Sequence, residues 1–396
     1  MSKITEVYSS LCLFTVTRGV LKTPVIKAFI DYCEEEEKQE KLKKYGKFVS
    51  EIYKNGANLS ECIKKALFED ENVYVKALSH GEEINKNIEK SLIFELNTLT
   101  ELSSITSDSF SLDMKISTKL PEYDTTKVDI EKSYKERLKS IHKYGYGIFA
   151  FNCMFSSTDD GEIVPVESAD KISIDSFIGY QEERKKVLDN TEAFIKGQPA
   201  ANILLYGDAG TGKSSTVKAV ANHLFDSGIR LIEIRKNQLL LLPKIMAKIA
   251  KNPLKFIIFI DDLSFNKNDD NFSMLKATLE GSASAKAKNA VIYATSNRRH
   301  IVKESFGDRE GSDIHRNDTV QETLSLSERF GLTILFAKPS KPLYLEIIKE
   351  LAHRKGVTMD ENELFVKAEA FALNRGYRSA RCAEQFIDLI ISTESN

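Results

Sequence analysis

The sequence lacks the features that mark secreted and membrane proteins. Its five cysteines are scattered and odd in number, and no two of them have the C-x-x-C spacing. This usage argues against a disulfide framework or a zinc site and suits a reducing compartment. The apolar stretch "LCLFTVT" near the N-terminus ends at Arg18 and is too short for a signal peptide or a membrane span. We therefore expect a cytoplasmic protein with no membrane association.

Neither sign of charge dominates the chain. Fifty-six Lys and Arg residues face 58 Asp and Glu residues, which gives a net charge of −2. The overall field therefore does not draw the protein toward nucleic acid or a membrane surface, although a local basic patch stays open. Apolar residues make up 42% and charged residues 29%, an ordinary globular balance. A chain of 396 residues is too long for one ordinary core, so we expect two or three domains.

The first part of the chain is predicted to be helical. Residues 1–127 form a mainly helical N-terminal domain, because "VIKAFIDYCEEEEKQEKLKKYGKFVSEIYKNG" spaces its apolar residues three and four apart. Its end, "TELSSITSDSFSLDMKISTKLPEYDTT" (residues 100–126), is rich in Ser, Thr and Asp and is predicted to be a loop or linker. Residues 128–172 are predicted to be a connector, with a helix followed by a β-hairpin that turns at Asp160-Gly161.

From Ile174 onward the pattern changes to alternating strands and helices. The short apolar runs "IRLIEIR", "FIIFI", "AVIYATS" and "LTILFA" are separated by helix-length segments. Such runs are typical of parallel strands that are buried on both faces. We therefore predict a three-layer α/β/α nucleotide-binding domain with a parallel sheet over residues 173–338, and helices over residues 339–396.

One stretch predicts a phosphate site. "GDAGTGKS" matches the pattern G-x-x-x-x-G-K-[ST] in full, with the strand "NILLY" before it and the helix "SSTVKAVANHLF" after it. The glycines let backbone N–H groups turn toward a polyphosphate, and the helix start adds its positive end. Lys213 can reach the β- and γ-phosphates, and the Ser214 hydroxyl can ligate Mg²⁺. The predicted nucleotide-binding residues here are Gly207, Asp208, Ala209, Gly210, Thr211, Gly212, Lys213, Ser214 and Ser215.

A second motif follows some fifty residues later. "FIIFIDDLSF" is an apolar strand that ends in Asp261 and Asp262. A carboxylate at that strand end is where a P-loop enzyme holds Mg²⁺. We therefore assign Asp261, with Ser214, to the metal.

These two motifs and four further segments resemble the AAA+ ATPases, which implies ATP with Mg²⁺ as the ligand and a C-terminal helical lid. "IDSFIGYQEERKKVL" is similar to the segment before the P-loop in that class, which implies that Ile178 and Gly179 lie beside the adenine. "VIYATSNRRH" resembles the sensor-1 strand, with Asn297 at its polar tip. "LSLSERFGL" resembles the arginine-finger segment, with Arg329.

The fourth segment, "RGYRSARCAEQFI", resembles the start of the sensor-2 helix, with Arg381 as the better match and Arg378 as the second. The whole combination closely resembles a bacterial AAA+ family called domain of unknown function 815, over roughly residues 145–396. This resemblance implies an ATPase core and a lid but no particular substrate. The first hundred residues carry no motif of this kind.

The resemblance also implies roles for the polar residues. Asp262 orients or deprotonates the attacking water, Asn297 polarises that water or the γ-phosphate, and Arg381 touches the phosphates from the lid. Arg329 reaches the nucleotide of a neighbouring subunit, so the protein is expected to be a homo-oligomer, as a ring or an ATP-dependent assembly. AAA+ proteins usually carry Glu in place of Asp262, and the shorter arm puts the rate of hydrolysis in doubt.

The sequence is compatible with three functions of the ATPase. We favour remodelling of a protein partner, bound through the N-terminal domain, over a DNA-associated ATPase of the helicase-loader or clamp-loader kind. A slowly hydrolysing ATP switch is the third. The segment "RKNQLLLLPKIMAKIAKNP" lacks the aromatic residue and glycine of a threading pore loop. The cluster in "SNRRHIVKES" contacts nucleic acid or, as we favour, a neighbouring subunit, and its basic members are Arg298, Arg299, His300 and Lys303.

Overall fold

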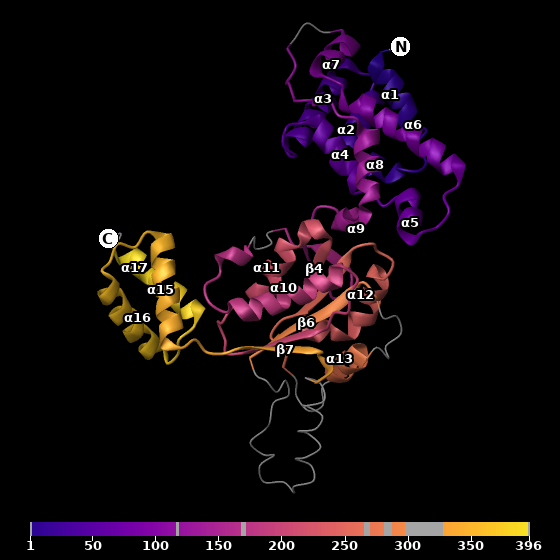
Figure 1. Cartoon of the computed structure of the whole chain (residues 1–396). Coiled ribbons are helices and arrows are strands. Elements are labelled where there is room, and N and C mark those ends of the chain that lie inside the picture. Colours follow the sequence, from indigo (N-terminus) through magenta and orange to yellow (C-terminus); the bar gives the residue numbers. More distant parts are fainter. Residues whose placement is uncertain are drawn as a thin grey trace. The chain divides into compact units, whose positions relative to one another are not determined.

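The computed structural model describes residues 2–115, 119–167, 172–264, 270–280, 287–297 and 328–394. The chain divides into two compact units. The first comprises Met1–Phe151 and Lys251–Leu254, and the second comprises Asn152–Ala250 and Lys255–Asn396 (Figure 1). Among the described residues, no helix is both long and apolar enough to cross a membrane.

The first unit is built from helices around one apolar core, as the sequence pattern predicts. Several helices begin at a residue whose side chain accepts a backbone N–H of the first turn, as Asn58 and Asp129 do. The elements are α1 Lys3–Leu11, η1 Arg18–Lys22, α2 Pro24–Cys33, α3 Lys38–Tyr53, α4 Leu59–Phe68, α5 Val73–His80, α6 Lys86–Ser103, α7 Ser107–Met114, α8 Ile130–Lys139, α9 Ile141–Tyr144 and η2 Gly147–Phe149.

The prediction of a loop over residues 100–126 is wrong for its first half, because α6 continues to Ser103 and α7 spans Ser107–Met114. Phe110 of α7 is fully buried at the centre of an aromatic cluster. Its ring lies 4.9 Å from the rings of both Tyr32 and Tyr45 and 5.5 Å from that of Phe48. The Ser- and Asp-rich composition misled the prediction, because these residues also start and anchor helices: Asp113 of α7 accepts hydrogen bonds from Ser2 and Tyr32.

The predicted connector over residues 128–172 does not form one piece. Its helix α8 packs with α6, and Tyr134 and Leu138 are buried in the core of the first unit. Its hairpin, β1 Met154–Ser157 and β2 Ile163–Pro165, joins the sheet of the second unit. A short later segment returns to the first unit: Leu254 is fully buried and lies so close to Gly145 that a Cβ there would be 2.4 Å from its side chain.

The second unit contains a seven-stranded sheet in the order β2-β1-β4-β5-β6-β3-β7. Every neighbouring pair is parallel except β1 with β2, which is antiparallel as predicted for the hairpin. The remaining strands are β3 Ile203–Gly207, β4 Ile229–Glu233, β5 Lys255–Ile260, β6 Ala290–Ser296 and β7 Leu332–Phe336. The predicted parallel α/β sheet is therefore confirmed.

Helices cover this sheet because its strands are apolar on both faces. Leu205, Phe259 and Tyr293 pack with residues of α10 and α11, which lie together on one side of the sheet (Figure 1). The alternate residues Leu204 and Ile258 are also fully buried, so the other face is covered as well. The helical elements are η3 Ile174–Ser176, α10 Gln181–Ile195, α11 Lys213–His223, η4 Phe225–Ser227, η5 Lys236–Leu241, α12 Leu242–Ile249 and α13 Asp270–Glu280.

The chain after the sheet is helical, as predicted. It forms α15 Lys341–Lys355, α16 Glu361–Arg375 and α17 Ala380–Glu394. These three helices share a small apolar core of their own that includes Tyr344 and Phe386. They form the lid of the second unit.

Candidate functional site

Three strand ends bring the predicted residues together. In the sheet, β6 lies between β5 and β3, and all three run parallel. Their carboxyl ends therefore meet at one edge, which is where open α/β sheets bind ligands. Gly207 ends β3, Asp261 follows β5 and Asn297 follows β6.

The loop after β3 has the backbone that a phosphate site requires. Gly207, Gly210 and Gly212 have φ values of 137°, 75° and 89°, in the left-handed region that glycine adopts without strain. At Gly207 a Cβ would also lie only 2.0 Å from the carbonyl oxygen of Phe336. Helix α11 begins directly afterward at Lys213, so its N-terminal N–H groups point into the loop.

Lys213 is held at the centre of this edge. Its side chain is buried, and its ammonium donates to the carbonyl oxygens of Gly207 at 2.8 Å and Asp208 at 2.7 Å, and to Asn297 Oδ1 at 3.2 Å. Burial lowers the pKa of the ammonium, and nearby carboxylates, among them Asp261, act in the opposite direction. The site therefore fixes one positive charge where a polyphosphate would lie.

Asp261 accepts hydrogen bonds from two neighbouring hydroxyl groups. One of its oxygens, Oδ1, accepts the Ser214 hydroxyl at 2.6 Å and the Thr295 hydroxyl at 2.5 Å. Mg²⁺ takes hard oxygen ligands and usually completes its shell with water and substrate phosphates. The Ser214 hydroxyl and the Asp261 carboxylate fit that requirement. In the part of the chain that the structure describes, no group of three or more His, Cys, Asp or Glu residues could hold a metal by protein ligands alone.

Asp262 has an unusual backbone. Its φ is 50°, in the left-handed region, and its N–H donates to Thr295 Oγ1 at 2.9 Å. Its carboxylate accepts a hydrogen bond from the Asn297 amide at 2.9 Å. Asp and Asn enter the left-handed region more readily than longer side chains do. The conformation therefore gives a physical reason for Asp at this position.

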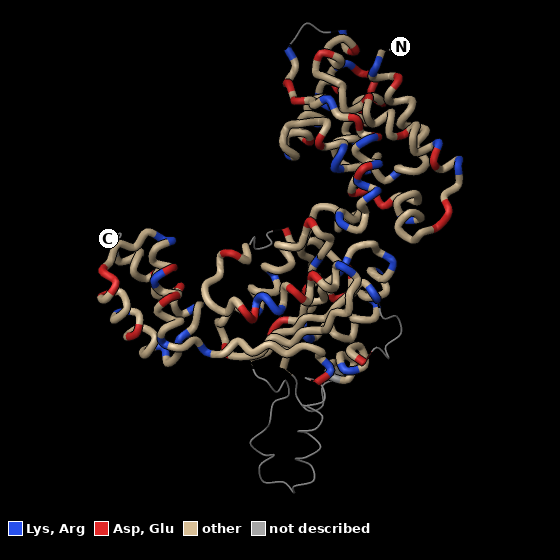
Figure 2. Tube along the Cα trace, in the orientation of Figure 1, with Lys and Arg blue, Asp and Glu red and all other residues tan. Residues whose placement is uncertain are grey.

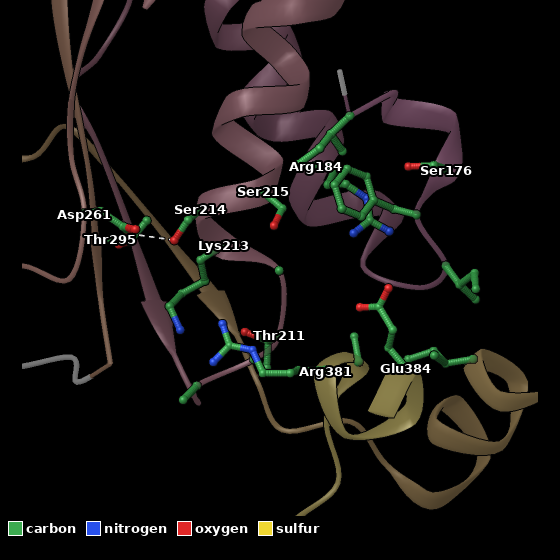
Figure 3. A pocket seen from close by; sticks show the side chains of 18 of the residues that line it. Ser176, Arg184, Thr211, Lys213, Ser214, Ser215, Asp261, Thr295, Arg381 and Glu384 are labelled. Carbon is green, nitrogen blue, oxygen red and sulfur yellow. Dashed lines mark hydrogen bonds between the residues drawn. The ribbon is translucent and has the colours of Figure 1, made fainter. Parts of the chain in front are cut away.

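These residues line a cavity of about 720 Å³, a volume that suits a nucleotide. The lining includes the P-loop and Ile178, while Arg381 and Glu384 come from α17 of the lid (Figure 3). The Arg381 N–H also donates to the Gly210 carbonyl at 3.3 Å. Gly179 lines a shallower hollow beside this cavity. The lining residues that the sequence predicts are Ile178, Ala209, Gly210, Thr211, Gly212, Lys213, Ser214, Ser215, Asp261, Asp262, Asn297 and Arg381.

Some predicted residues lie elsewhere. Arg329 is not among the residues that line the cavity, and it pairs with Glu280 of α13 at 2.5 Å. Arg378, the second candidate for sensor 2, pairs with Glu369 at 2.7 Å instead of facing the cavity. The basic cluster at 298–303 lies outside the described residues.

The structure adds residues that sequence reasoning missed. Thr295 contacts both acidic residues, and it could have been found, because it lies two positions before Asn297 and period-2 alternation places both on one side of the strand. Arg184 and Glu384 also line the cavity. No sequence signal separates them from the other charged residues of their helices.

A glycine turn that opens a helix, a serine hydroxyl that donates to an aspartate, and a helical lid beside a parallel sheet define the class of AAA+ nucleotide-binding P-loop NTPases. Residues 149–394 match the family described as protein of unknown function (DUF815). Because this match spans more than half of the chain, the protein belongs to that family. No curated protein matches the chain significantly.

Solved structures of the Holliday junction branch migration motor RuvB from Thermotoga maritima are similar to this chain. One is 19% identical with a TM-score of 0.37, and the match covers 55% of this chain and 63% of that one. Two mutants of the same motor are 18% and 21% identical, with TM-scores of 0.38 and 0.37 and the same coverage. The chain therefore spans less than two thirds of that motor's length.

Proposed function

We propose that this protein is a Mg²⁺-dependent ATPase that couples hydrolysis to a conformational change in an assembly and thereby remodels a protein partner. The observation that carries the ATPase proposal is one continuous hydrogen-bond network. Lys213, Asn297 and Asp262 form one branch, and Ser214, Asp261 and Thr295 form the other. Both branches line the same cavity, so phosphate, metal and water positions are adjacent.

Each residue then has a defined task. Lys213 and the P-loop N–H groups hold the β- and γ-phosphates, and Ser214 with Asp261 holds Mg²⁺, which neutralises charge on the phosphates. Asp262 accepts a proton from, or orients, the attacking water, and Asn297 fixes the direction of that carboxylate. Arg381 contacts the phosphates from the lid, so the lid senses whether the γ-phosphate is present. Ile178 and Gly179 flank the adenine.

Assembly is supported by Arg329. An arginine that completes a neighbour's site does not need to face its own, and Arg329 lies outside its own cavity at the edge of α13. Its partner Glu280 is 40% exposed, so the pair is accessible for exchange with a second copy. Such fingers contribute about 10³-fold or more in rate. We therefore infer a homo-oligomer with sites shared between subunits.

A protein partner is favoured over nucleic acid for two reasons. The first unit has its own core and can present a surface independently of the nucleotide site. Figure 2 shows Lys and Arg interspersed with Asp and Glu along the described residues of both units, whereas a nucleic-acid track concentrates one sign. Binding of the partner through the first unit is the corresponding proposal.

A slow ATP switch is the second candidate, and Asp262 favours it. Its carboxylate is short, its backbone is in the left-handed region, and Asn297 already occupies one of its oxygens. Each of these features restricts how the carboxylate meets a water. The switch and the motor share one site and differ in turnover.

One experiment separates these readings. The rate of ATP hydrolysis is measured at increasing protein concentration, with and without Mg²⁺ and with and without DNA. A specific rate that rises with concentration supports shared sites. Tight ATP binding with negligible turnover at every concentration supports the switch, and strong stimulation by DNA would overturn the protein-partner proposal. A chain that binds no nucleotide would overturn the ATPase proposal itself.

A further inference from the structure

The buried side of the nucleotide cavity contains a charged group that the proposed roles leave unused. Arg184 lies on α10 and lines the same cavity as Lys213 and Ser215. Arg184 is only 5% exposed. It lies within the AAA+-like segment "IDSFIGYQEERKKVL", but the resemblance assigns it no role.

The guanidinium of Arg184 has no conventional partner. It makes no hydrogen bond or ion pair with any residue that the structure describes, and its Nη2 is buried and unsatisfied. The ring of Phe177 lies 4.7 Å from the guanidinium carbon and supplies a cation–π contact. Burial lowers the pKa of Arg184 to about 10, although Glu183 and Tyr180 act in the opposite direction. The group is therefore charged at neutral pH and forms no ion pair with a carboxylate of the described residues.

A buried charge without an anion destabilises a protein, so such a group calls for a ligand. The position of Arg184 identifies which part of a nucleotide would supply the anion. Ser214 marks the metal end through its bond to Asp261, and in Figure 3 Ser214, Ser215 and Arg184 follow one another across the cavity. A nucleotide with its β- and γ-phosphates at Lys213 therefore brings its α-phosphate toward Arg184.

The lid carries the opposite charge at this end. Glu384 of α17 points toward the side of the cavity that Arg184 occupies (Figure 3). A carboxylate repels phosphate but accepts hydrogen bonds from hydroxyl groups. The phosphate is therefore expected on the core side, beside Arg184, and the ribose hydroxyls on the lid side.

We propose that Arg184 is a nucleotide-binding residue that donates to the α-phosphate, and that its Phe177-backed guanidinium is stabilised only when that phosphate is bound. This proposal rests on the proposed function, because it requires the cavity to bind ATP and ADP. It goes further by assigning the recognition of the α-phosphate to a residue outside the P-loop. Arg184 is a binding residue and takes no part in the transfer of the γ-phosphate.

The test compares Arg184→Met with the unaltered full chain by calorimetric titration with Mg·ADP and by thermal unfolding. Met keeps much of the length and the contact with Phe177 but has no donor. The affinity for ADP should fall by about 10- to 100-fold, the usual range for loss of a hydrogen bond to a charged group. Without nucleotide the variant should unfold at the same or a higher temperature, because the unpaired charge is gone. Arg184→Lys should retain part of the affinity.

Arg137 of α8 provides the matched control. It is a partly buried arginine whose Nε also lacks a hydrogen-bond partner, and burial lowers its pKa to about 10. Its guanidinium lies 4.6 Å from the ring of Phe68. Unlike Arg184, it donates to the carbonyl oxygens of Tyr144 and Ala150. Arg137→Met should therefore lower the unfolding temperature and leave the ADP affinity unchanged.

Three outcomes would overturn the inference. They are equal ADP affinity in Arg184→Met and the parent, an Arg184→Met protein that unfolds earlier without nucleotide, and an affinity loss that disappears when 2′-deoxy-ADP replaces ADP, which would move the contact to the ribose. If Arg184→Met does not fold, an Arg184→Lys protein with the parent's affinity for ADP also overturns it. A parent protein that fails to bind ADP contradicts the proposed function itself, which is a distinct result.

Discussion

In the first unit, the carboxylate of Glu95 is fully buried and accepts hydrogen bonds from the backbone N–H groups and hydroxyls of Thr15 and Thr17, and from the N–H of Val16. In the second unit, the guanidinium of Arg184 is buried to a similar extent and has no such partner among the described residues. Both residues are largely buried, but among the described residues only Glu95 has hydrogen-bond partners for its charged group. The Glu95 carboxylate therefore stabilises the fold, whereas the Arg184 guanidinium indicates a bound ligand.

The same contrast separates the surroundings of the two groups. Both oxygens of Glu95 are hydrogen-bonded, and its loss would leave several donors unsatisfied. The polar groups of the nucleotide cavity come from three strand ends and a lid, so no single element can satisfy them. A buried charge is thus informative about function only after its hydrogen bonds have been accounted for.

The largest effect is expected at Lys213. Lys213→Ala should weaken ATP binding by about 100-fold or more, because it removes a buried ammonium at the phosphate position. The far-ultraviolet circular dichroism spectrum should not change, because the Lys213 ammonium donates to loop carbonyls and to Asn297. Calorimetric titration with Mg·ATP measures the affinity. A variant that binds ATP as tightly as the parent would show that the cavity is not a phosphate site.

Variants of Arg329 test whether a charged side chain that already forms an ion pair can also act in catalysis. Arg329→Ala should bind ATP normally but lose hydrolysis by about 10³-fold, since its finger serves a neighbour. Mixed with Lys213→Ala subunits it should regain some activity, because each hybrid interface can pair an intact phosphate site with an intact finger. Steady-state hydrolysis of the mixture measures this rescue. A well-mixed pair without rescue, in a chain that stays monomeric with ATP, leaves Arg329 as the ion-pair partner of Glu280 alone.

The two acidic residues after β5 should differ in kind. Asp262→Asn should still bind Mg·ATP but hydrolyse it about 100-fold more slowly, because the amide accepts no proton from water. Asp261→Asn should instead raise the Mg²⁺ concentration required for half-maximal binding. Metal titration and turnover are measured on both variants. Asp262→Glu should not exceed the parent rate, because its backbone is left-handed; indistinguishable Asn variants would refute the two assignments.

Substitution of Glu95 is expected to affect the stability of the fold and to leave nucleotide binding unchanged. Glu95→Ala should lower the free energy of unfolding by about 3 kcal/mol or more, because it leaves buried N–H and hydroxyl donors without an acceptor. Glu95→Gln, which keeps one acceptor oxygen, should cost less. Denaturant unfolding followed by circular dichroism gives both values, and ADP affinity at low denaturant should match that of the parent. A fall in ADP affinity would place Glu95 in the functional class as well.

The smallest effect concerns Asp70 in the first unit, whose Oδ2 is buried without a partner. Burial raises its pKa from 3.8 to about 6, so folding favours the neutral carboxyl. The resulting stabilisation is complete below about pH 4 and is lost as the pH rises through 6. The difference in unfolding temperature between Asp70→Asn and the parent should therefore grow from pH 4 to pH 7. A difference that is constant with pH would show that Asp70 does not titrate in this range.

That the candidate site residues lie around one cavity could be predicted from the sequence, because the chemistry of a phosphate site imposes local spacing. The glycines of the P-loop, the aspartates after β5 and Asn297 after β6 follow from strand ends that must meet at one edge. Conformations tied to a single residue were also predictable in kind. The antiparallel hairpin around Asp160-Gly161 is an example, since Gly161 has φ of 78°.

The remaining features depend on tertiary packing. Arg184 stands in the charged stretch "QEERKKV", where nothing distinguishes a buried arginine from its exposed neighbours. Phe110 is an isolated aromatic residue among serines, and only its ring contacts with α2 and α3 reveal a helix there. Periodicity reports which side of an element is apolar, but it does not report which partner covers that side.

The return of Lys251–Leu254 to the first unit has a consequence for how the protein is made. A ribosome must synthesise about a hundred residues of the second unit before Leu254 emerges to meet Gly145. The N-terminal helices can condense earlier, but their unit is incomplete until then. During translation, the first unit therefore cannot complete its folding before synthesis of the second unit has begun.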